Sequence, residues 1–134
     1  MAEFSAIVPA DVAAPEGGYV HGLRLAAGQE LLFVSGQIPS NPDGSIAQGF
    51  DAQCRAVWRN ILAVLQAAGL GVGDIVKITT FLTSRDNAAR NGAIRREVLG
   101  SHQPALTVIV AQTLDPAWLL EIEAIAASRS PQHG

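Results

Sequence analysis

The sequence contains one cysteine, Cys54, few aromatic residues and no excess of positive charge. A single cysteine excludes an intrachain disulfide, so a reducing compartment is the expected environment. Aromatic residues make up only 5% of the chain, so its core must be built mainly from Ala, Val, Ile and Leu. A formal net charge of -3 disfavours binding to the phosphate backbone of nucleic acids, and no nucleic-acid partner is expected.

Long hydrophobic runs are also missing. No apolar segment approaches the ~20 residues needed to cross a bilayer, so no membrane partner is expected. The first residues lack the basic start and apolar stretch of a secretory signal, so the expected location is cytoplasmic. The histidines, His21, His102 and His133, are scattered without the spacing of metal ligands, and no metal site is predicted.

The chain does contain enough apolar sequence for a substantial core. Its 134 residues are 49% hydrophobic and 16% charged, which predicts a single globular domain over residues 1–134. Residues 1–14 are small and weakly patterned, and they are expected to form a loose arm. Residues 128–134 are expected to form a disordered tail.

Helical periodicity is clearest over residues 50–68. Apolar residues recur there at three- and four-residue spacing, which predicts an amphipathic helix followed by Gly69 as its C-terminal residue. A second helix is predicted over 87–98, and Gly100 is expected to end it. Cys54 lies on the apolar stripe of the first helix, which favours a buried structural thiol over a nucleophile.

Alternation of apolar and polar residues predicts strands in the rest of the chain. The predicted strands cover residues 19–25, 31–34, 74–82, 105–111 and 118–126. The element order β-β-α-β-α-β-β predicts an α/β domain in which two helices cover one face of a sheet. Two helices leave the opposite face bare, so this face is expected to be buried against other copies of the chain in a homo-oligomer.

Two carboxylates in the last predicted strand are candidates for chemistry. Glu121 and Glu123 are two residues apart, so both point to the same face of the sheet. A buried carboxylate must be paired, hydrogen-bonded or in contact with a ligand, whereas an exposed face with two solvated glutamates is an equally good interpretation. Ser35 and Gly36 follow a strand and can bind a substrate through a hydroxyl and a backbone N–H, or simply form a turn.

Four motifs in a fixed order give a more specific indication. They are Gly18-Tyr19-Val20-His21-Gly22, Val34-Ser35-Gly36-Gln37-Ile38-Pro39, Ala67-Ala68-Gly69-Leu70 with Val72-Gly73-Asp74-Ile75-Val76-Lys77, and Glu121-Ile122-Glu123-Ala124-Ile125-Ala126. In this order they resemble the Rid (YjgF) family of reactive-intermediate enamine/imine deaminases. The resemblance implies a chorismate-mutase-like α+β fold with a mixed sheet, and a trimer whose sheets line a central barrel. It also implies small-molecule sites in the clefts between subunits.

The resemblance further implies an activity and a set of residues. The activity is hydrolysis of imines or enamines, such as 2-iminopropanoate, without a metal or organic cofactor. Glu121 matches the residue that positions the attacking water, and Glu123 is its structural neighbour. The positions that match pocket residues of the family are Tyr19, Ser35, Gly36 and Asn91, with Ser35 assigned to catalysis beside Glu121.

One position departs from the family pattern. The family's deaminases carry an arginine that clamps the substrate carboxylate, and the segment Pro104-Ala105-Leu106 places Leu106 there. Leucine cannot form the bidentate, charge-assisted pair that a guanidinium forms with a carboxylate. The loss of such a partner costs about 2–5 kcal/mol of binding at a buried site. The helix segment 94–97 also lacks the aromatic residues usual in the family, and the candidates for replacing the charge from a neighbouring chain are Arg24, Arg85 and Arg95.

Three functions are compatible with these features. The first is hydrolytic deamination of an enamine or imine, with a larger or uncharged substrate because of Leu106. The second is a non-catalytic regulatory trimer that binds a small metabolite in the same cleft. The third, a ribonuclease, conflicts with the acidic charge balance.

Overall fold

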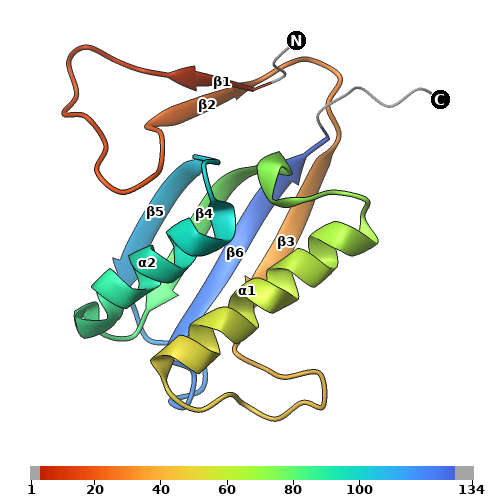
Figure 1. The fold of residues 1–134 in the computed structure, drawn as a ribbon, viewed down its shortest axis with the longest axis vertical. Coiled ribbons are helices and arrows are strands. Elements are labelled where there is room, and N and C mark those ends of the chain that lie inside the picture. Colours follow the sequence, from red (N-terminus) through yellow and green to blue (C-terminus); the bar gives the residue numbers. More distant parts are fainter. Residues whose placement is uncertain (1–3, 129–134) are drawn as a thin grey trace.

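The computed structural model describes residues 4–128, which form a sheet covered by two helices and a small second sheet at one end (Figure 1). The strands are β1 (Phe4–Ile7), β2 (Gly22–Leu25), β3 (Leu31–Gln37), β4 (Ile75–Leu82), β5 (Ala105–Val110) and β6 (Leu120–Ala127). The helices are α1 (Phe50–Ala67) and α2 (Ala88–Leu99). The short 3₁₀ turn η1 (Val72–Asp74) follows α1, and η2 (Arg85–Asn87) directly precedes α2. The architecture is mixed α+β, which confirms the predicted fold class.

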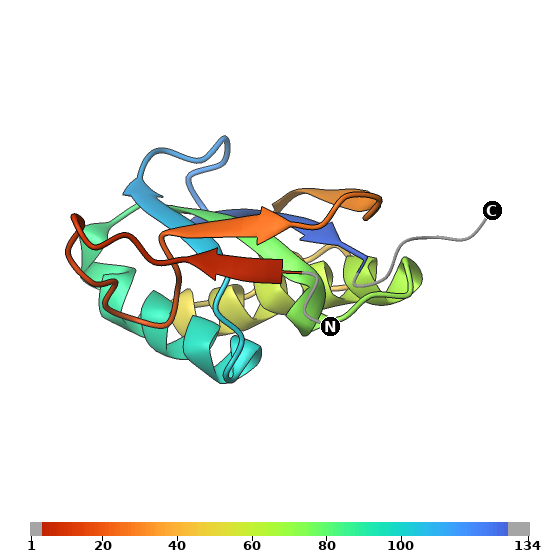
Figure 2. The same ribbon diagram turned by 90° about the horizontal axis from the view of Figure 1, so that it is seen from above.

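The larger sheet has the strand order β3-β6-β4-β5. β4 and β5 are parallel, whereas β6 runs antiparallel to both of its neighbours. A parallel pair needs a long crossover connection, and α2 provides it between β4 and β5. Figure 2 shows both helices on the same side of this sheet, as the sequence predicted.

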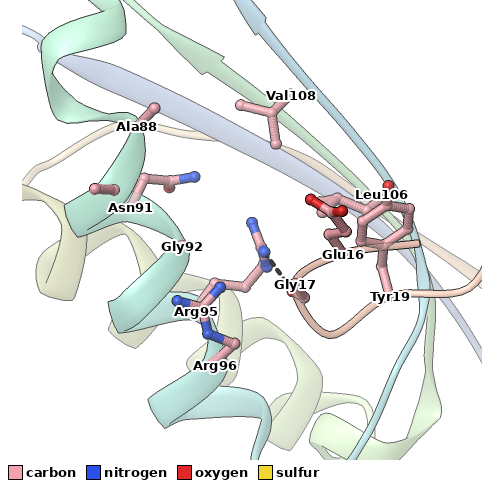
Figure 3. Close-up of a pocket in the computed structure, with 11 residues that line it drawn as sticks. Glu16, Gly17, Tyr19, Ala88, Asn91, Gly92, Arg95, Arg96, Leu106 and Val108 are labelled. Carbon is pink, nitrogen blue, oxygen red and sulfur yellow. Dashed lines mark hydrogen bonds between the residues drawn. The ribbon is translucent and has the colours of Figure 1, made fainter. Parts of the chain in front are cut away.

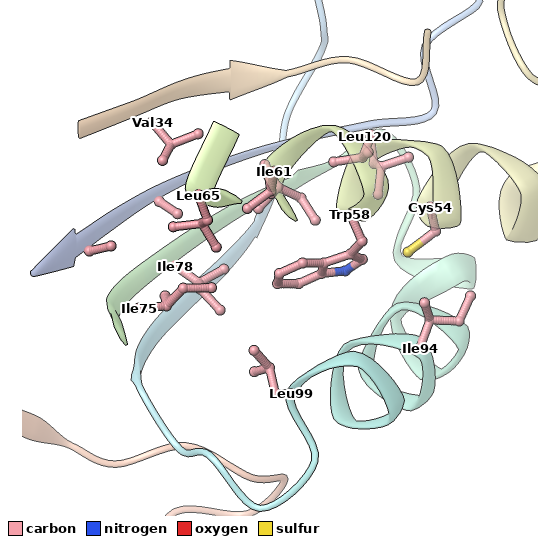
Figure 4. Close-up of a cluster of buried hydrophobic side chains, with 14 of the residues drawn as sticks. Val34, Cys54, Trp58, Ile61, Leu65, Ile75, Ile78, Ile94, Leu99 and Leu120 are labelled. Atoms are coloured by element: carbon pink, nitrogen blue, oxygen red, sulfur yellow. The ribbon is translucent and has the colours of Figure 1, made fainter. Parts of the chain in front are cut away.

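The hydrophobic core fills the space between this sheet and the helices (Figure 4). Trp58, Ile61 and Leu65 of α1 are almost completely buried and meet Ile78 of β4 and Ile122 of β6. The three helix residues are spaced by three and four positions, so they share one face of α1, and this face packs on the side of the sheet to which Ile78 and Ile122 point. The predicted apolar stripe of the first helix is therefore confirmed as a core surface.

The opposite face of the sheet carries apolar side chains without a covering layer. Phe33 and Leu31 of β3 are 69% and 51% exposed, and Ile109 of β5 is 44% exposed. Phe33 lies directly opposite Ile125 of β6 in the strand register. Single exposed apolar residues are ordinary, but a row of them across neighbouring strands is typical of an interaction surface.

The predicted strand over residues 19–25 is wrong in extent and in its sheet. Only β2 is a strand, and it pairs with β1 rather than with the large sheet. Gly17 and Gly18 adopt positive φ angles of 112° and 81°, which turn the chain and leave Val20 with a single bridge to Ala105. Gly22 then allows close pairing with β1, because a Cβ at that position would lie 3.3 Å from the Cβ of Ile7.

The last strand begins at Leu120 and not at Trp118. Gln53, buried on α1, holds the preceding residues out of the strand register. Its amide nitrogen donates to the carbonyl of Ala117 at 2.9 Å, and its amide oxygen accepts from the backbone N–H of Leu119 at 2.8 Å. β3 is longer than predicted, since it continues past Val34 to Gln37 through an irregular register.

Both ends of the described chain are attached to strands. β1 lies within the predicted loose arm, and its pairing with β2 orders that part of the arm. Ser128, the first residue of the predicted disordered tail, is buried, and its hydroxyl accepts a hydrogen bond from the N–H of Glu30 at 3.0 Å. The rest of that predicted tail, 129–134, lies outside the described residues.

Candidate functional site

The predicted site residues fall into two groups on one chain. Tyr19, Asn91 and Leu106 line a cavity of about 400 Å³ between α2, β5 and the segment before β2 (Figure 3). The other predicted residues, Ser35, Gly36 and Glu121, do not line this cavity. They lie instead where β3 meets β6. A single copy of the chain therefore separates the candidate pocket from the candidate water-positioning carboxylate.

One face of α2 forms the polar wall of the cavity. Asn91 and Gly92 lie three and four residues after Ala88, and Arg95 lies four residues after Asn91, so these residues share one face. Asn91 and Arg95 are 2% and 5% exposed. The side-chain oxygen of Asn91 and the Nε of Arg95 are buried without a hydrogen-bond partner in the described part of the chain. Buried polar atoms are normally satisfied, so these two point to a missing partner.

Arg95 lines this cavity on the same chain, whereas the sequence offered it only as a charge from a neighbouring chain. Its Nη2 donates to the carbonyl of Gly17 at 2.8 Å, and Figure 3 shows the guanidinium directed from α2 toward the opposite wall. Burial lowers the pKa of Arg95 below its usual value, and the charge of Arg96 lowers it further. The available signal was its position four residues after Asn91, which puts both side chains on one helical face.

The opposite wall of the cavity comes from β5 and is apolar. Leu106 and Val108 line it, and they lie opposite Ile78 and Thr80 of β4 in the strand register. Because β5 alternates, these two side chains point to the side of the sheet that the helices cover. The position where the resemblance implies a clamping arginine thus faces the cavity and holds a half-buried leucine.

The second group of residues is organised around a close contact between β3 and β6. The carboxylate of Glu121 lies against the backbone of Gly36, where a Cβ would be only 2.0 Å from Oε2. Only glycine fits at this position while the carboxylate stays in place. The register between β3 and β6 is irregular between Val34 and Gln37, so Ser35 and Gly36 sit at a local break in the ladder.

Both strand carboxylates lie on one face of the sheet, as predicted, and the structure shows that this face is the one away from the helices. Glu121 pairs with Phe81 and Glu123 with Thr79 of β4, two residues apart on each strand. Glu121 is half-buried, whereas Glu123 and Ser35 are exposed. This difference in burial distinguishes two glutamates that the strand pattern alone treated alike.

Other chemical groups of the chain have structural surroundings. Cys54 is buried, and burial raises the pKa of its thiol to about 12, so the thiol is protonated at neutral pH. Among residues 4–128, no cluster of three His, Cys, Asp or Glu side chains could hold a metal ion. Over the same residues, no helix has the length and apolar character that a membrane crossing requires.

Comparison with known proteins agrees with these features. The family model described as Endoribonuclease L-PSP matches residues 10–128. A RutC family protein of Pyrococcus horikoshii is 37% identical over 114 residues, which cover 84% of this chain and 88% of the relative. A 2-iminobutanoate/2-iminopropanoate deaminase of Salmonella typhimurium is 37% identical over 117 residues, covering 84% of this chain and 89% of that protein.

A solved structure gives the same result at the level of the fold. YyfB of Yersinia pestis, a protein of unknown function in the conserved Rid family, superposes with a TM-score of 0.83 at 29% identity. The match covers 94% of this chain and 99% of YyfB. The fold is thus that of the small chorismate-mutase-like α+β domains. Within that class, the chain belongs to the Endoribonuclease L-PSP family, which is the Rid (YjgF) family that the motifs resemble.

Proposed function

We propose that the protein is a hydrolytic deaminase of a reactive enamine or imine. The observation that carries this proposal is the half-buried carboxylate of Glu121, which lies against the backbone of Gly36, where a Cβ would be 2.0 Å from Oε2. The relative from Salmonella typhimurium that is named a 2-iminobutanoate/2-iminopropanoate deaminase supports the reaction class. No cofactor is needed for this chemistry, because water is the only co-reactant.

Glu121 has the character that the proposed reaction requires. Its carboxylate accepts a proton from a water molecule as the water oxygen attacks the carbon of the C=N bond. The electron pair of that bond moves to nitrogen, which takes up a proton and gives a carbinolamine. Collapse of the carbinolamine forms the C=O bond and releases ammonia. Ser35, exposed beside Gly36, is the proposed hydroxyl donor to the developing charge.

The complete site is proposed to form between copies of the chain. Glu121, Ser35 and Gly36 lie outside the cavity that Tyr19, Asn91 and Leu106 line, so a substrate in that cavity needs a carboxylate from elsewhere. The uncovered apolar face around Phe33 provides a surface for assembly. A homotrimer whose sheets face one another brings the carboxylate of one copy to the cavity of the next.

Leu106 is proposed to alter the substrate specificity. It lines the cavity and replaces a charged clamp with an apolar surface, which favours a substrate with a larger apolar group than that of 2-iminopropanoate. The same observation favours the second candidate function, a regulatory trimer that binds a small metabolite without turnover. The acidic balance of the chain disfavours the ribonuclease activity suggested by the family description. The cytoplasmic location stays a prediction.

Release of ammonia and keto acid from enzymatically generated imines tests this proposal. We expect wild type to favour imines with larger side chains over 2-iminopropanoate, and Leu106→Arg to shift this preference toward the smaller substrate. Glu121→Gln should lower the rate about 100-fold or more, as expected for the loss of a general base. Glu123→Gln is the matched control, because Glu123 is exposed on the same strand face, and its rate should stay within about threefold of wild type.

The two candidate functions give different results in this assay. A wild-type protein that is inactive on every imine tested, yet binds the corresponding keto acids, identifies the regulatory trimer. A Glu121→Gln variant with the rate of wild type contradicts the role proposed for this carboxylate.

A further inference from the structure

The cavity carries more positive charge than its surroundings neutralise. Arg95 and Arg96 both line it, and neither forms an ion pair with a described residue. Two other arginines of these helices are paired, since Arg90 binds Asp51 and Arg55 binds Glu97. A buried guanidinium without a counter-ion is costly, because desolvation penalises its charge.

Glycines on two segments leave room for these guanidinium groups. A methyl group at Gly92 would lie 3.1 Å from Nη1 of Arg96 and 3.8 Å from Nη2 of Arg95. A Cβ at Gly17 would lie 3.5 Å and 3.7 Å from the same two atoms. Both arginines therefore pack into a space that the missing side chains create between α2 and the segment before β2.

One donor group of Arg95 is already occupied and another is free. Nη2 is held by the carbonyl of Gly17, which fixes the orientation of the guanidinium plane. Nε is buried and has no partner among the described residues. A carboxylate is an acceptor that a guanidinium binds with strong, charge-assisted hydrogen bonds.

We propose that Arg95 is the anchor for the carboxylate of an organic acid in this cavity, in place of the arginine that Leu106 replaces. The inference rests on the proposed function, because it names the anionic group of the substrate that the deaminase would bind. Arg95 lies on α2 of the same chain as Leu106. The positive charge therefore comes from α2 and not from β5, and no neighbouring copy is needed to supply it.

The walls of the cavity define the rest of the ligand. Leu106 and Val108 offer an apolar surface across from Arg95, and the ring of Tyr19 lies beside Leu106 (Figure 3). A carboxylate on Arg95 directs the remainder of the molecule toward this surface. The substrate class is therefore an anionic 2-imino acid with a branched or extended apolar side chain, and not an uncharged imine.

Glu16 is the acidic residue of the cavity lining, and it is exposed. It forms no ion pair with Arg95 or Arg96 in the described part of the chain. Its charge opposes the binding of an anion in the cavity. Removing that charge in Glu16→Gln should tighten the binding of a carboxylate about two- to threefold.

Isothermal titration of the full chain tests the proposal with two unreactive probes. The first is 3-methyl-2-oxobutanoate, which carries a carboxylate, and the second is its neutral counterpart 3-methyl-2-butanone. We expect wild type to bind the carboxylate at least tenfold more tightly than the ketone. Arg95→Gln removes the charge and keeps a polar side chain, and should weaken carboxylate binding about thirtyfold while leaving the affinity for the ketone unchanged.

Two further variants make the result unambiguous. Arg59→Gln removes the same charge from an exposed site of α1 outside the cavity, and should change the affinity for the carboxylate less than twofold. Arg95→Met is the second variant in case Arg95→Gln does not fold, and thermal unfolding checks both.

The outcomes separate this inference from the proposed function. Equal affinity of wild type for both probes, or an Arg95 variant that binds the carboxylate as tightly as wild type, overturns the role of Arg95. If imines are still hydrolysed when the role of Arg95 has failed, the proposed deaminase function remains supported. Arg95-dependent binding without turnover of any imine keeps the carboxylate site and overturns the deaminase.

Discussion

The two sides of the large sheet differ in how they are closed. On the helix side, α1 and α2 cover β4 and β6, and the apolar side chains between them are almost completely buried. On the open side, Phe33 and Leu31 are exposed and Glu121 is half-buried. The first side explains how one chain folds. The second side has the composition of an interface, and in the proposed function the site that it carries is completed by assembly.

The same difference applies to charge. Two exposed arginines of the helices are paired with acidic residues, Arg90 with Asp51 and Arg55 with Glu97. Arg95, buried in the cavity, has no such partner among the described residues. A charge that is buried and unpaired indicates a ligand more strongly than a charge that is exposed and paired.

The largest expected effect comes from a charge on the open side. Phe33→Asp should dissociate the proposed homotrimer, because each copy would bury an unpaired carboxylate at the interface, and the dissociation constant should rise at least about 1000-fold, or about 4 kcal/mol. Light scattering measures the mass. Ala63→Asp, which adds the same charge to the exposed surface of α1, should leave the mass unchanged. A Phe33→Asp protein with the mass of wild type contradicts the assigned interface.

Two neighbouring residues of β4 allow the contribution of each side of the sheet to stability to be compared. Ile78→Ala should lower the free energy of unfolding by about 2–4 kcal/mol, because Ile78 is fully buried on the helix side. Thr79→Ala, on the open side of the same strand, should cost less than about 1 kcal/mol. Urea denaturation measures both. Equal losses for the two variants would contradict the assignment of the core to one side.

Gly36→Ala tests the contact between β3 and β6. The added methyl group cannot share its space with the carboxylate of Glu121, so the carboxylate must move away from its position. Ammonia release should fall about 100-fold, which corresponds to about 2.7 kcal/mol. Gly73→Ala is the matched control, because no atom lies within 4 Å of a Cβ there. A Gly36→Ala enzyme with normal activity shows that the position of this carboxylate is not important for the reaction.

The smallest effect is expected at the ion pair between α1 and α2. A hydrogen bond from Arg90 lowers the pKa of Asp51, so the pair stabilises the folded state at pH values above the ordinary pKa of aspartate. That contribution disappears as the pH falls through the lowered pKa. Because both side chains are exposed, Asp51→Asn should lower the melting temperature only slightly at neutral pH and low salt. A decrease that persists in high salt or at acidic pH contradicts this origin.

Much of the fold could be predicted because its elements have clear periodicity. The stripe that contains Ile61 and Leu65 identified α1, and Gly69 and Gly100 end their helices with positive φ angles of 74° and 60° as expected. The alternation around Glu121 identified β6. Local pattern determines such elements almost alone, since each is buried on one face.

The errors lie where distant contacts override local pattern. The segment 19–21 alternates like a strand, but the turn at Gly17 and Gly18 leaves it outside the main ladder. Trp118 also continues an apolar pattern, yet Gln53 of α1 binds the adjacent backbone and delays the strand. Neither interaction is visible without the tertiary structure.

The candidate site shows the same limit. Motifs identified Tyr19, Asn91, Leu106 and Glu121 by position, but they did not reveal that the first three lie in one cavity and Glu121 outside it. Arg95 was expected to act, if at all, from a neighbouring chain. Its place in the cavity that Leu106 also lines depends on how α2 lies over the sheet, which no local pattern describes.

Subunit mixing tests most directly whether the site is formed by two copies. Leu106→Trp fills the cavity and Glu121→Gln removes the carboxylate, so each variant alone should be inactive in ammonia release. Random co-assembly in equal amounts joins an intact cavity to a neighbour's intact carboxylate at about a quarter of the sites of a head-to-tail ring. The account predicts about a quarter of wild-type activity in the mixture, whereas a mixture as inactive as its parents would contradict it.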